Sequence, residues 1–240
     1  MLTRKPAVRA DFTVKPLPDD AEHIDLHRQF SAEEYRLLKL GFVPSAPGDD
    51  WSAFFENGAF FIHWHATGEC FCVLQLAETA GGCEIADAHI HRPALPGYLS
   101  GDQSTIVDRL NGIVTELLNW IDLTEKPATL ENWRDLSAMP EKNVRLDLNI
   151  PVTAASFEKM RWGFIPRVME DRWFFFMEDN WLHLYRSWTG HCIYQIRFEP
   201  DEDGGYRAAE LVVNRDPDQY GGSDDYDRNW IVTFLRQGYA

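Results

Sequence analysis

Apolar and polar residues alternate along short runs in both halves of the chain. In the first half, aromatic-rich runs with a period near two residues lie at 53–55, 59–65, 70–76 and 84–90, separated by Thr-Gly and Gly-Gly turns. A period of two places successive side chains on opposite faces of a β-strand. These runs therefore predict the strands of an antiparallel sheet.

Helical signals precede and follow these predicted strands. Ser31, with Glu34 three residues later, predicts a helix N-cap with a capping box. Gly41 stands where that helix is expected to end, because glycine adopts a left-handed conformation without strain. A short strand at 24–26 and a final helix over about 105–119 complete the unit. The order is β-α-β-β-β(-β)-α, an α+β unit with an antiparallel sheet.

The second half of the chain repeats this unit. Residues 24–76 align with 146–198 without a gap at an offset of 122, and both copies share a Gly-Phe-x-Pro block and a Thr-Gly-x-Cys block. The partner helix starts at Thr153 and ends at Gly163, and a late helix is predicted near 228–237. We therefore predict an α+β tandem duplication with antiparallel sheets, packed as one pseudo-twofold body.

The repeat also predicts the domain boundaries. Residues 1–23 form an N-terminal arm, 24–119 the first repeat unit, 120–143 a connecting segment and 144–240 the second repeat unit. The arm mixes charges with prolines, so we expect it to be loose. A short helix is predicted within the connecting segment at 130–136.

Composition and charge narrow the choice of partners. The chain has 240 residues, 45% of them hydrophobic, and a formal net charge of -15. Such a charge repels phosphate backbones, so nucleic acid is disfavoured as a partner. A basic protein surface or a cation is compatible with this charge, and so is the absence of any charged partner. Because no secretory signal or membrane-spanning apolar run is present and the four cysteines are sparse, we expect a cytoplasmic protein with reduced thiols.

The first unit carries histidines and cysteines at alternate strand positions. With tight turns at 66–69 and 79–82, His63 would lie opposite Cys72 and Cys72 opposite His89, which places the whole group on one sheet face. Zinc prefers nitrogen and sulfur ligands. The alternative is a polar sheet face with hydrogen-bonded histidines. The second unit lacks these residues, so the shared fold does not need a metal. The candidate zinc ligands are His63, His65, Cys70, Cys72, His89 and His91.

The second unit carries a different group at the turn between its second and third aromatic strands. Two arginines, a histidine, turn N–H groups and a tryptophan face are suited to an anionic, ring-bearing ligand such as a nucleotide or ADP-ribose. The alternative is that the arginines pair with acidic residues and the tryptophan packs. The candidate ligand-binding residues are Arg186, Ser187, Trp188, His191 and Arg215.

Residues 170–235 resemble a small uncharacterised bacterial domain with an aromatic strand pair, an RSWTG turn and a closing VNRD segment. Similar segments occur beside ADP-ribosylglycohydrolase-like domains, so the resemblance implies a link to ADP-ribose or NAD-related biology. It supplies no catalytic residues, and the hydrolase module itself is absent from the chain. The resemblance rests on Trp173, Arg186, Ser187, Trp188, Thr189, Gly190, Asn214, Arg215 and Asp216.

Established catalytic motifs are missing from the sequence: it has no GxSxG, no P-loop, no GxGxxG opening a helix and no HExxH. We therefore expect a non-catalytic cytoplasmic binding protein, of accessory or immunity type, that recognises a protein partner or a small anionic ligand. The alternatives are an enzyme or ligand-binding module for an ADP-ribose-like or nucleotide-like ligand, and a zinc-binding protein that uses the His/Cys group.

Overall fold

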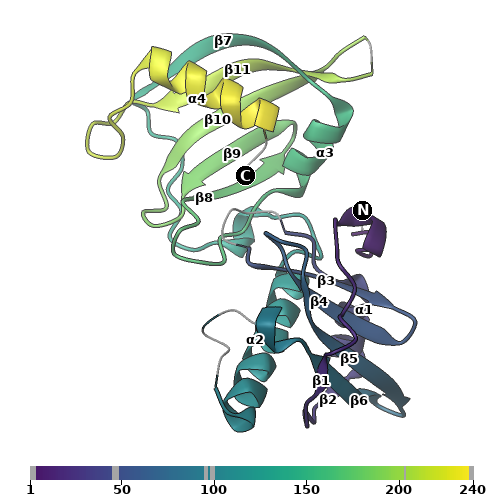
Figure 1. Cartoon of the computed structure of the whole chain (residues 1–240). Helices are drawn as coiled ribbons and strands as arrows, with labels where there is room; N and C mark the ends of the chain where they lie inside the picture. The colour runs from purple at the N-terminus through teal and green to yellow at the C-terminus, as the bar shows by residue number, and fades with distance from the viewer. Residues whose placement is uncertain (1–3, 45–48, 95–96, 98–100, 203, 238–240) are drawn as a thin grey trace. The chain divides into compact units, whose positions relative to one another are not determined.

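The chain forms two compact units, Met1–Glu125 and Lys126–Ala240. The computed structural model describes residues 4–44, 49–94, 97, 101–202 and 204–237. Each unit has its own antiparallel sheet and two α-helices (Figure 1). The predicted α+β class and the two similar units are confirmed. Packing as one pseudo-twofold body stays a prediction.

The sheet of the first unit has the order β1-β6-β5-β4-β3, and β2 also pairs with β6. All its pairings are antiparallel. Its elements are β1 (Glu22–His23), β2 (Gln29–Ser31), α1 (Ala32–Leu40), β3 (Trp51–Glu56), β4 (Ala59–Trp64), β5 (Cys70–Thr79), β6 (Gly82–Ile90) and α2 (Gln103–Leu123).

The sheet of the second unit has the matching order β7-β11-β10-β9-β8. Helices α3 and α4 lie on the same face of this sheet (Figure 1). Its elements are β7 (Asn143–Val152), α3 (Ala154–Trp162), β8 (Trp173–Glu178), β9 (Trp181–Arg186), β10 (Cys192–Pro200), β11 (Tyr206–Asn214) and α4 (Asp224–Gln237).

The first hairpin of each sheet turns at the same place in the repeat. Asn57 and Gly58 connect β3 to β4, and Asp179 and Asn180 connect β8 to β9, all with positive φ. Two successive residues with positive φ suit a two-residue turn whose twist matches that of the flanking strands. The predicted helix ends are also confirmed, because Gly41 and Gly163 are the C-caps of α1 and α3.

The N-terminal arm and the connecting segment occupy equivalent places in the two units. Lys15 N donates to Gly68 O at 2.8 Å, and Ser137 N donates to Gly190 O at 2.9 Å. A Cβ added to either glycine would lie 2.0 Å from a backbone oxygen of the covering segment, that of Thr13 or Asp135. Each segment is thus held against the turn of its own unit, and the arm is not loose.

Two predicted elements differ from the structure. The strand expected at 24–26 is interrupted: β1 ends at His23, and Leu26 N donates to Ile24 O at 2.9 Å, which is a local turn. Ile24 and Leu26 are both buried, as expected of apolar residues two apart in a strand, so the alternation alone did not reveal the turn. The helix expected at 130–136 is a single 3₁₀ turn, η4 (Leu130–Asn132).

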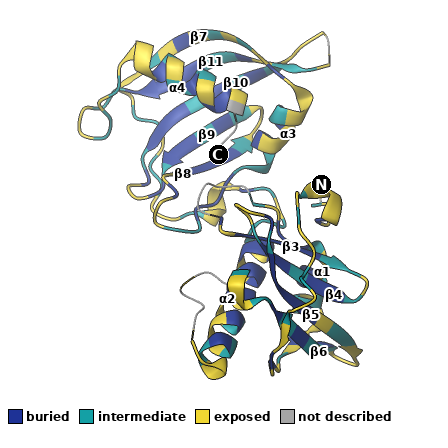
Figure 2. Ribbon diagram, viewed as in Figure 1, coloured by how far each residue is buried: buried dark blue, intermediate teal, exposed yellow. Residues whose placement is uncertain are grey.

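The cores lie between the sheets and the helices (Figure 2). In the first unit the buried side of α2 includes Leu110, Val114 and Leu117. In the second unit Phe234 of α4 contacts Phe175 of β8 edge to face. No helix in the described part of the chain is both long and apolar enough to span a membrane.

Candidate functional site

The residues predicted to bind a ligand in the second unit are brought to one end of its sheet. Arg186 ends β9, and Arg215 directly follows β11. The intervening turn is closed by Arg186 N, which donates to His191 O at 3.0 Å, and by Gly190 N, which donates to Arg186 O at 2.8 Å. The sheet therefore places the predicted residues near each other, and their contacts decide what they can bind.

Ser187 and Trp188 have different roles within this turn. The buried Ser187 hydroxyl donates to Asp171 O at 2.6 Å, and Ser187 O accepts from Trp133 Nε1 at 3.1 Å. Trp188 Nε1 donates to Met169 O at 2.9 Å, yet the residue is 69% exposed. Ser187 therefore holds the turn in place, whereas Trp188 presents a fixed aromatic ring to solvent.

The cationic groups of the turn already have partners. The Arg186 guanidinium lies over the Trp173 ring, 4.1 Å from its centre. His191 Nδ1 lies 3.1 Å from Ser137 Oγ. An anion would have to compete with these contacts.

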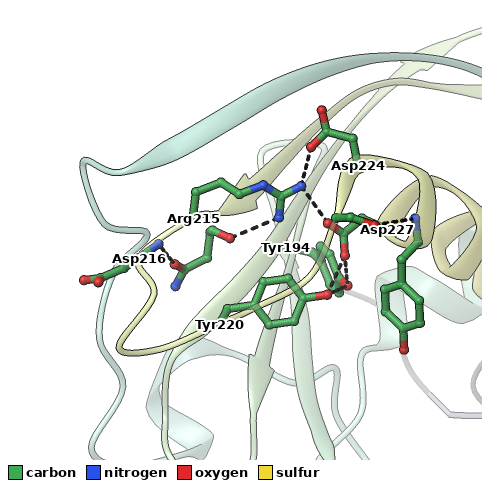
Figure 3. A network of polar contacts seen from close by, with 9 residues as sticks. Tyr194, Arg215, Asp216, Tyr220, Asp224 and Asp227 are labelled. Atoms are coloured by element: carbon green, nitrogen blue, oxygen red, sulfur yellow. Dashed lines mark hydrogen bonds and ion pairs between the residues drawn. The ribbon is translucent and has the colours of Figure 1, made fainter.

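Arg215 is bound more firmly still, by two carboxylates of α4 (Figure 3). Its Nη2 lies 2.6 Å from Asp224 Oδ1 and 2.7 Å from Asp227 Oδ2. The Asp227 side chain is completely buried. A buried charge is retained only when it is paired, so Arg215 is the counter-ion of Asp227.

Two tyrosines complete the network around Asp227. The Tyr194 hydroxyl donates to Asp227 Oδ1 at 2.7 Å and lies 2.6 Å from the Tyr220 hydroxyl, which also donates to Asp227 Oδ1. Burial and these hydrogen bonds raise the pKa of Tyr194 above its usual range. Burial and Asp227 raise the pKa of Tyr220 in the same way. A general base at neutral pH needs the opposite shift, so neither tyrosine is suited to that role.

The N-terminal end of α4 is acidic. Its first turn carries Asp224, Asp225 and Asp227. These carboxylates complement the positive end of the helix dipole and occupy the place where an anion would otherwise be favoured. The charge distribution therefore disfavours a phosphate beside Arg215.

Tyr194, Tyr220 and Asp227 were not predicted from the sequence as partners of Arg215. One signal for Asp227 was available: it shares a helical stripe with the buried residues Ile231 and Phe234, and a carboxylate on an apolar stripe needs a partner. The pairing with Tyr194 joins distant parts of the chain, and no spacing in the sequence predicts it. Asn214 is buried and donates to Cys192 O at 2.9 Å, so it supports the fold locally.

The histidines and cysteines of the first unit are divided between two sheet faces. A bulge after Ile62 pairs His63 with Cys70, while Cys72 pairs with Ile62 and Ile90. The predicted pairings of Cys72 with His63 and His89 are therefore wrong. A bulge adds a residue to one strand and shifts all later side chains.

The outer members of the group also point elsewhere. His89 lies beside Asp87, with 3.6 Å between Nδ1 and Oδ2, and His91 Nε2 lies 3.8 Å from Asp20. His65 is exposed. Among the described residues, no group of three or more His, Cys, Asp or Glu side chains is placed to hold a metal ion. The predicted zinc site thus gains no support from the geometry.

The buried members of the group are kept uncharged. Burial lowers the pKa of His63 to about 4 and raises the pKa of Cys70 to about 12. Burial likewise raises the pKa values of Cys72, Cys83 and Cys192. A nucleophilic cysteine needs a lowered pKa, so these thiols behave as small hydrophobic groups.

No family model matches this chain, and no curated protein matches it. Among solved structures, the chain is similar to DynU16, a protein in the dynemicin biosynthetic locus. The two share 15% sequence identity, and the match covers 93% of this chain and 96% of that chain with a TM-score of 0.25. At this TM-score the likeness supports no conclusion about fold or function.

Proposed function

We propose that the chain is a non-catalytic binding protein that recognises a protein partner, with Trp188 as the anchor of the contact. The supporting observation is that Trp188 is 69% exposed and its hydrogen-bonded neighbour Met169 is 75% exposed. Tryptophan and methionine are enriched in protein interfaces, and tryptophan dominates binding hot spots. Because the indole N–H is already held by Met169 O, the ring loses little freedom on binding.

The partner in this proposal is a basic protein whose surface offers an apolar recess for the Trp188 ring. The net charge of -15 favours a positively charged partner and repels polyanions. The proposal places both proteins in the cytoplasm, because all four cysteines are buried free thiols.

The contacts of Arg186 and Arg215 favour a protein partner over a small anion. Arg215 already neutralises Asp227, and Arg186 covers Trp173. The raised pKa values of Tyr194, Tyr220 and the buried cysteines oppose acid–base and nucleophilic roles. The polar network is therefore interpreted as a support for the turn that carries Trp188.

The test compares wild-type protein with Trp188→Ala and with Tyr226→Ala, which removes another exposed aromatic side chain of the same unit. Proteins retained from the source cell by the wild type are identified, purified and titrated against each variant by calorimetry. We expect Trp188→Ala to weaken the reconstituted complex about 30-fold or more, and Tyr226→Ala to leave its Kd unchanged. Added salt should raise the wild-type Kd. Equal affinity of wild type and Trp188→Ala, or no protein retained, would overturn the proposal.

A separate measurement addresses the small-ligand alternative. A thermal-shift titration with ADP-ribose, NAD and nucleotides should leave the midpoint unchanged, because the Arg215 guanidinium is already engaged by two carboxylates. A ligand at 100 times its Kd would add about 2.7 kcal/mol of stability. A shift of that size that is abolished by Arg186→Ala would replace the protein-partner proposal with the ligand-binding one.

A further inference from the structure

The outer edge of β7 is the most extensive unpaired backbone edge in the described part of the second unit. β7 runs over ten residues and is the terminal strand in the order β7-β11-β10-β9-β8. Its counterpart in the first unit is broken into β1 and β2. A long edge strand presents a row of N–H and C=O groups that another strand can pair with.

The hydrogen bonds of β7 show which residues face outward. Arg215 N donates to Lys142 O at 2.8 Å, so Lys142 faces β11. In an antiparallel pair, alternate residues face the neighbouring strand, so Arg145 and Asp147 turn their backbone groups to the free edge. Consistent with this, Arg228 Nη1 reaches Asp147 O at 2.5 Å.

The side chains at this edge leave one charge uncompensated. Asp147 lies directly opposite Glu210 of β11, which puts like charges side by side. Glu210 is paired with Arg145 at 2.6 Å and with Arg197 at 3.1 Å. No cation in the described part of the chain pairs with the Asp147 carboxylate.

We propose that β7 pairs antiparallel with β7 of a second copy of the chain, about a two-fold axis at Leu146. In this register Arg145 lies opposite Asp147 of the second copy, and Asp147 lies opposite Arg145 of the second copy. Each copy thus supplies the cation that the other copy's Asp147 lacks. On the other face of the strand, Val144 and Leu148 come into cross-strand contact, and both are half-buried in the single chain. The edge is therefore self-complementary in charge and in apolar character.

Arg228 opposes this association. Its guanidinium occupies the Asp147 carbonyl, one of the groups that the second strand needs. Charged side chains at edges are a common protection against unwanted pairing. Removing Arg228 should therefore tighten the dimer, which separates this pairing from association through any other surface.

The test is sedimentation velocity over a range of concentrations on the full chain and on charge-reversed variants. Because the two-fold axis repeats every contact, Arg145→Asp and Asp147→Arg each create two cross-strand pairs of like charges. Each variant should therefore weaken dimerisation about tenfold or more. The double variant R145D/D147R restores the opposite-sign pairs and should recover the dimer. Arg228→Ala should tighten it.

Glu178→Arg, on the opposite edge strand β8, is the matched control and should leave the association constant unchanged. Circular dichroism and thermal melting check that every variant is folded. If the wild type and Arg228→Ala both stay monomeric at the highest soluble concentration, the proposal is overturned. It is also overturned if the double variant fails to recover the association that the single reversals lose.

Discussion

The second unit buries a charged network at a place where the first unit buries only apolar groups. Tyr194 occupies the position in the repeat that Cys72 occupies in the first unit. Cys72 is completely buried and has no charged partner among the described residues. Arg92 lies just after β6, the strand that corresponds to β11, and it forms a surface ion pair with Glu22 instead, at 2.6 Å. The shared frame therefore folds without the network, and the network is an addition of the second unit.

The contrast between the units shows what a repeat can and cannot preserve. Both units keep the bulge at the cysteine that follows the turn: Cys70 pairs with His63, and Cys192 pairs with Tyr185. A buried polar network makes one arrangement of its elements much more favourable than others, because unpaired partners are costly in a low dielectric. We infer that it fixes the N-terminal end of α4 against the sheet in the second unit.

The greatest loss of stability should follow the removal of the buried carboxylate. Asp227→Ala removes the acceptor of two tyrosine hydroxyls and leaves Arg215 paired with the more exposed Asp224. Breaking a buried ion pair in this way costs about 3–5 kcal/mol. Hydrogen exchange with mass spectrometry at increasing urea should show the second unit opening at lower urea, with the first unit unchanged.

The sequence supplies a matched control for that experiment. Asp108 begins the same Asp-Arg pair in α2, but it is exposed. Asp108→Ala should therefore change the stability of the first unit by less than about 0.5 kcal/mol. Equal losses in the two units would show that the buried network has no special role.

Local signals in the sequence were enough to predict much of the fold. The alternation of aromatic residues placed the strands, and Gly41 and Gly163 marked the helix ends. The equivalence of the N-terminal arm and the connecting segment was missed, although Lys-Pro-Ala stands at 5–7 and again at 126–128. That match is short, and one extra residue between it and the segment that covers the turn (Thr13 to Lys15, Asp135 to Ser137) breaks the register of the repeat.

The candidate sites were harder to predict because they depend on long-range contacts. Register shifts at Ile62/His63 and at Gln75/Leu76 leave Cys72 opposite Ile62 and Ile90 instead of histidines, and spacing alone cannot reveal such shifts. Arg186 and Arg215 were correctly placed at one end of the sheet. Whether these arginines can bind an anion depends on their contacts with Trp173 and Asp227. Those contacts form only when the chain is folded.

A second difference between the units depends on pH. It lies at the repeat position that is His63 in the first unit and Tyr185 in the second. Burial lowers the pKa of His63 from 6.5 to about 4. Between these pH values the unfolded chain binds a proton that the folded chain excludes, so stability falls as the pH falls. The loss approaches about 3 kcal/mol near pH 4 and is absent above about pH 7.

The variant His63→Phe should remove this part of the pH dependence in the first unit. Urea unfolding of wild type and variant at a series of pH values measures it, with Tyr185→Phe in the second unit as the control that does not titrate in this range. Parallel stability curves for wild type and His63→Phe would contradict the prediction.

The smallest difference lies between the caps of the two equivalent helices α1 and α3. Ser31 and Glu34 form a complete capping box, in which Glu34 N donates to Ser31 Oγ at 3.2 Å and Glu34 Oε2 accepts from Ser31 N at 2.8 Å. At the equivalent place Thr153 Oγ1 accepts from Ser156 N at 3.1 Å, and the short Ser156 side chain cannot return the bond to the cap.

Replacing each cap by alanine should therefore destabilise the first unit by about 1 kcal/mol and the second by less. Conversely, Ser156→Glu supplies the missing half of the box and an acidic group in the first turn, and should stabilise the second unit by a few tenths of a kcal/mol. Thermal and urea midpoints of Ser31→Ala, Thr153→Ala and Ser156→Glu measure all three changes. A loss of stability in Ser156→Glu would mean that the Thr153–Ser156 hydroxyl contact at 2.9 Å is the stronger cap, and that the two helices start by different means.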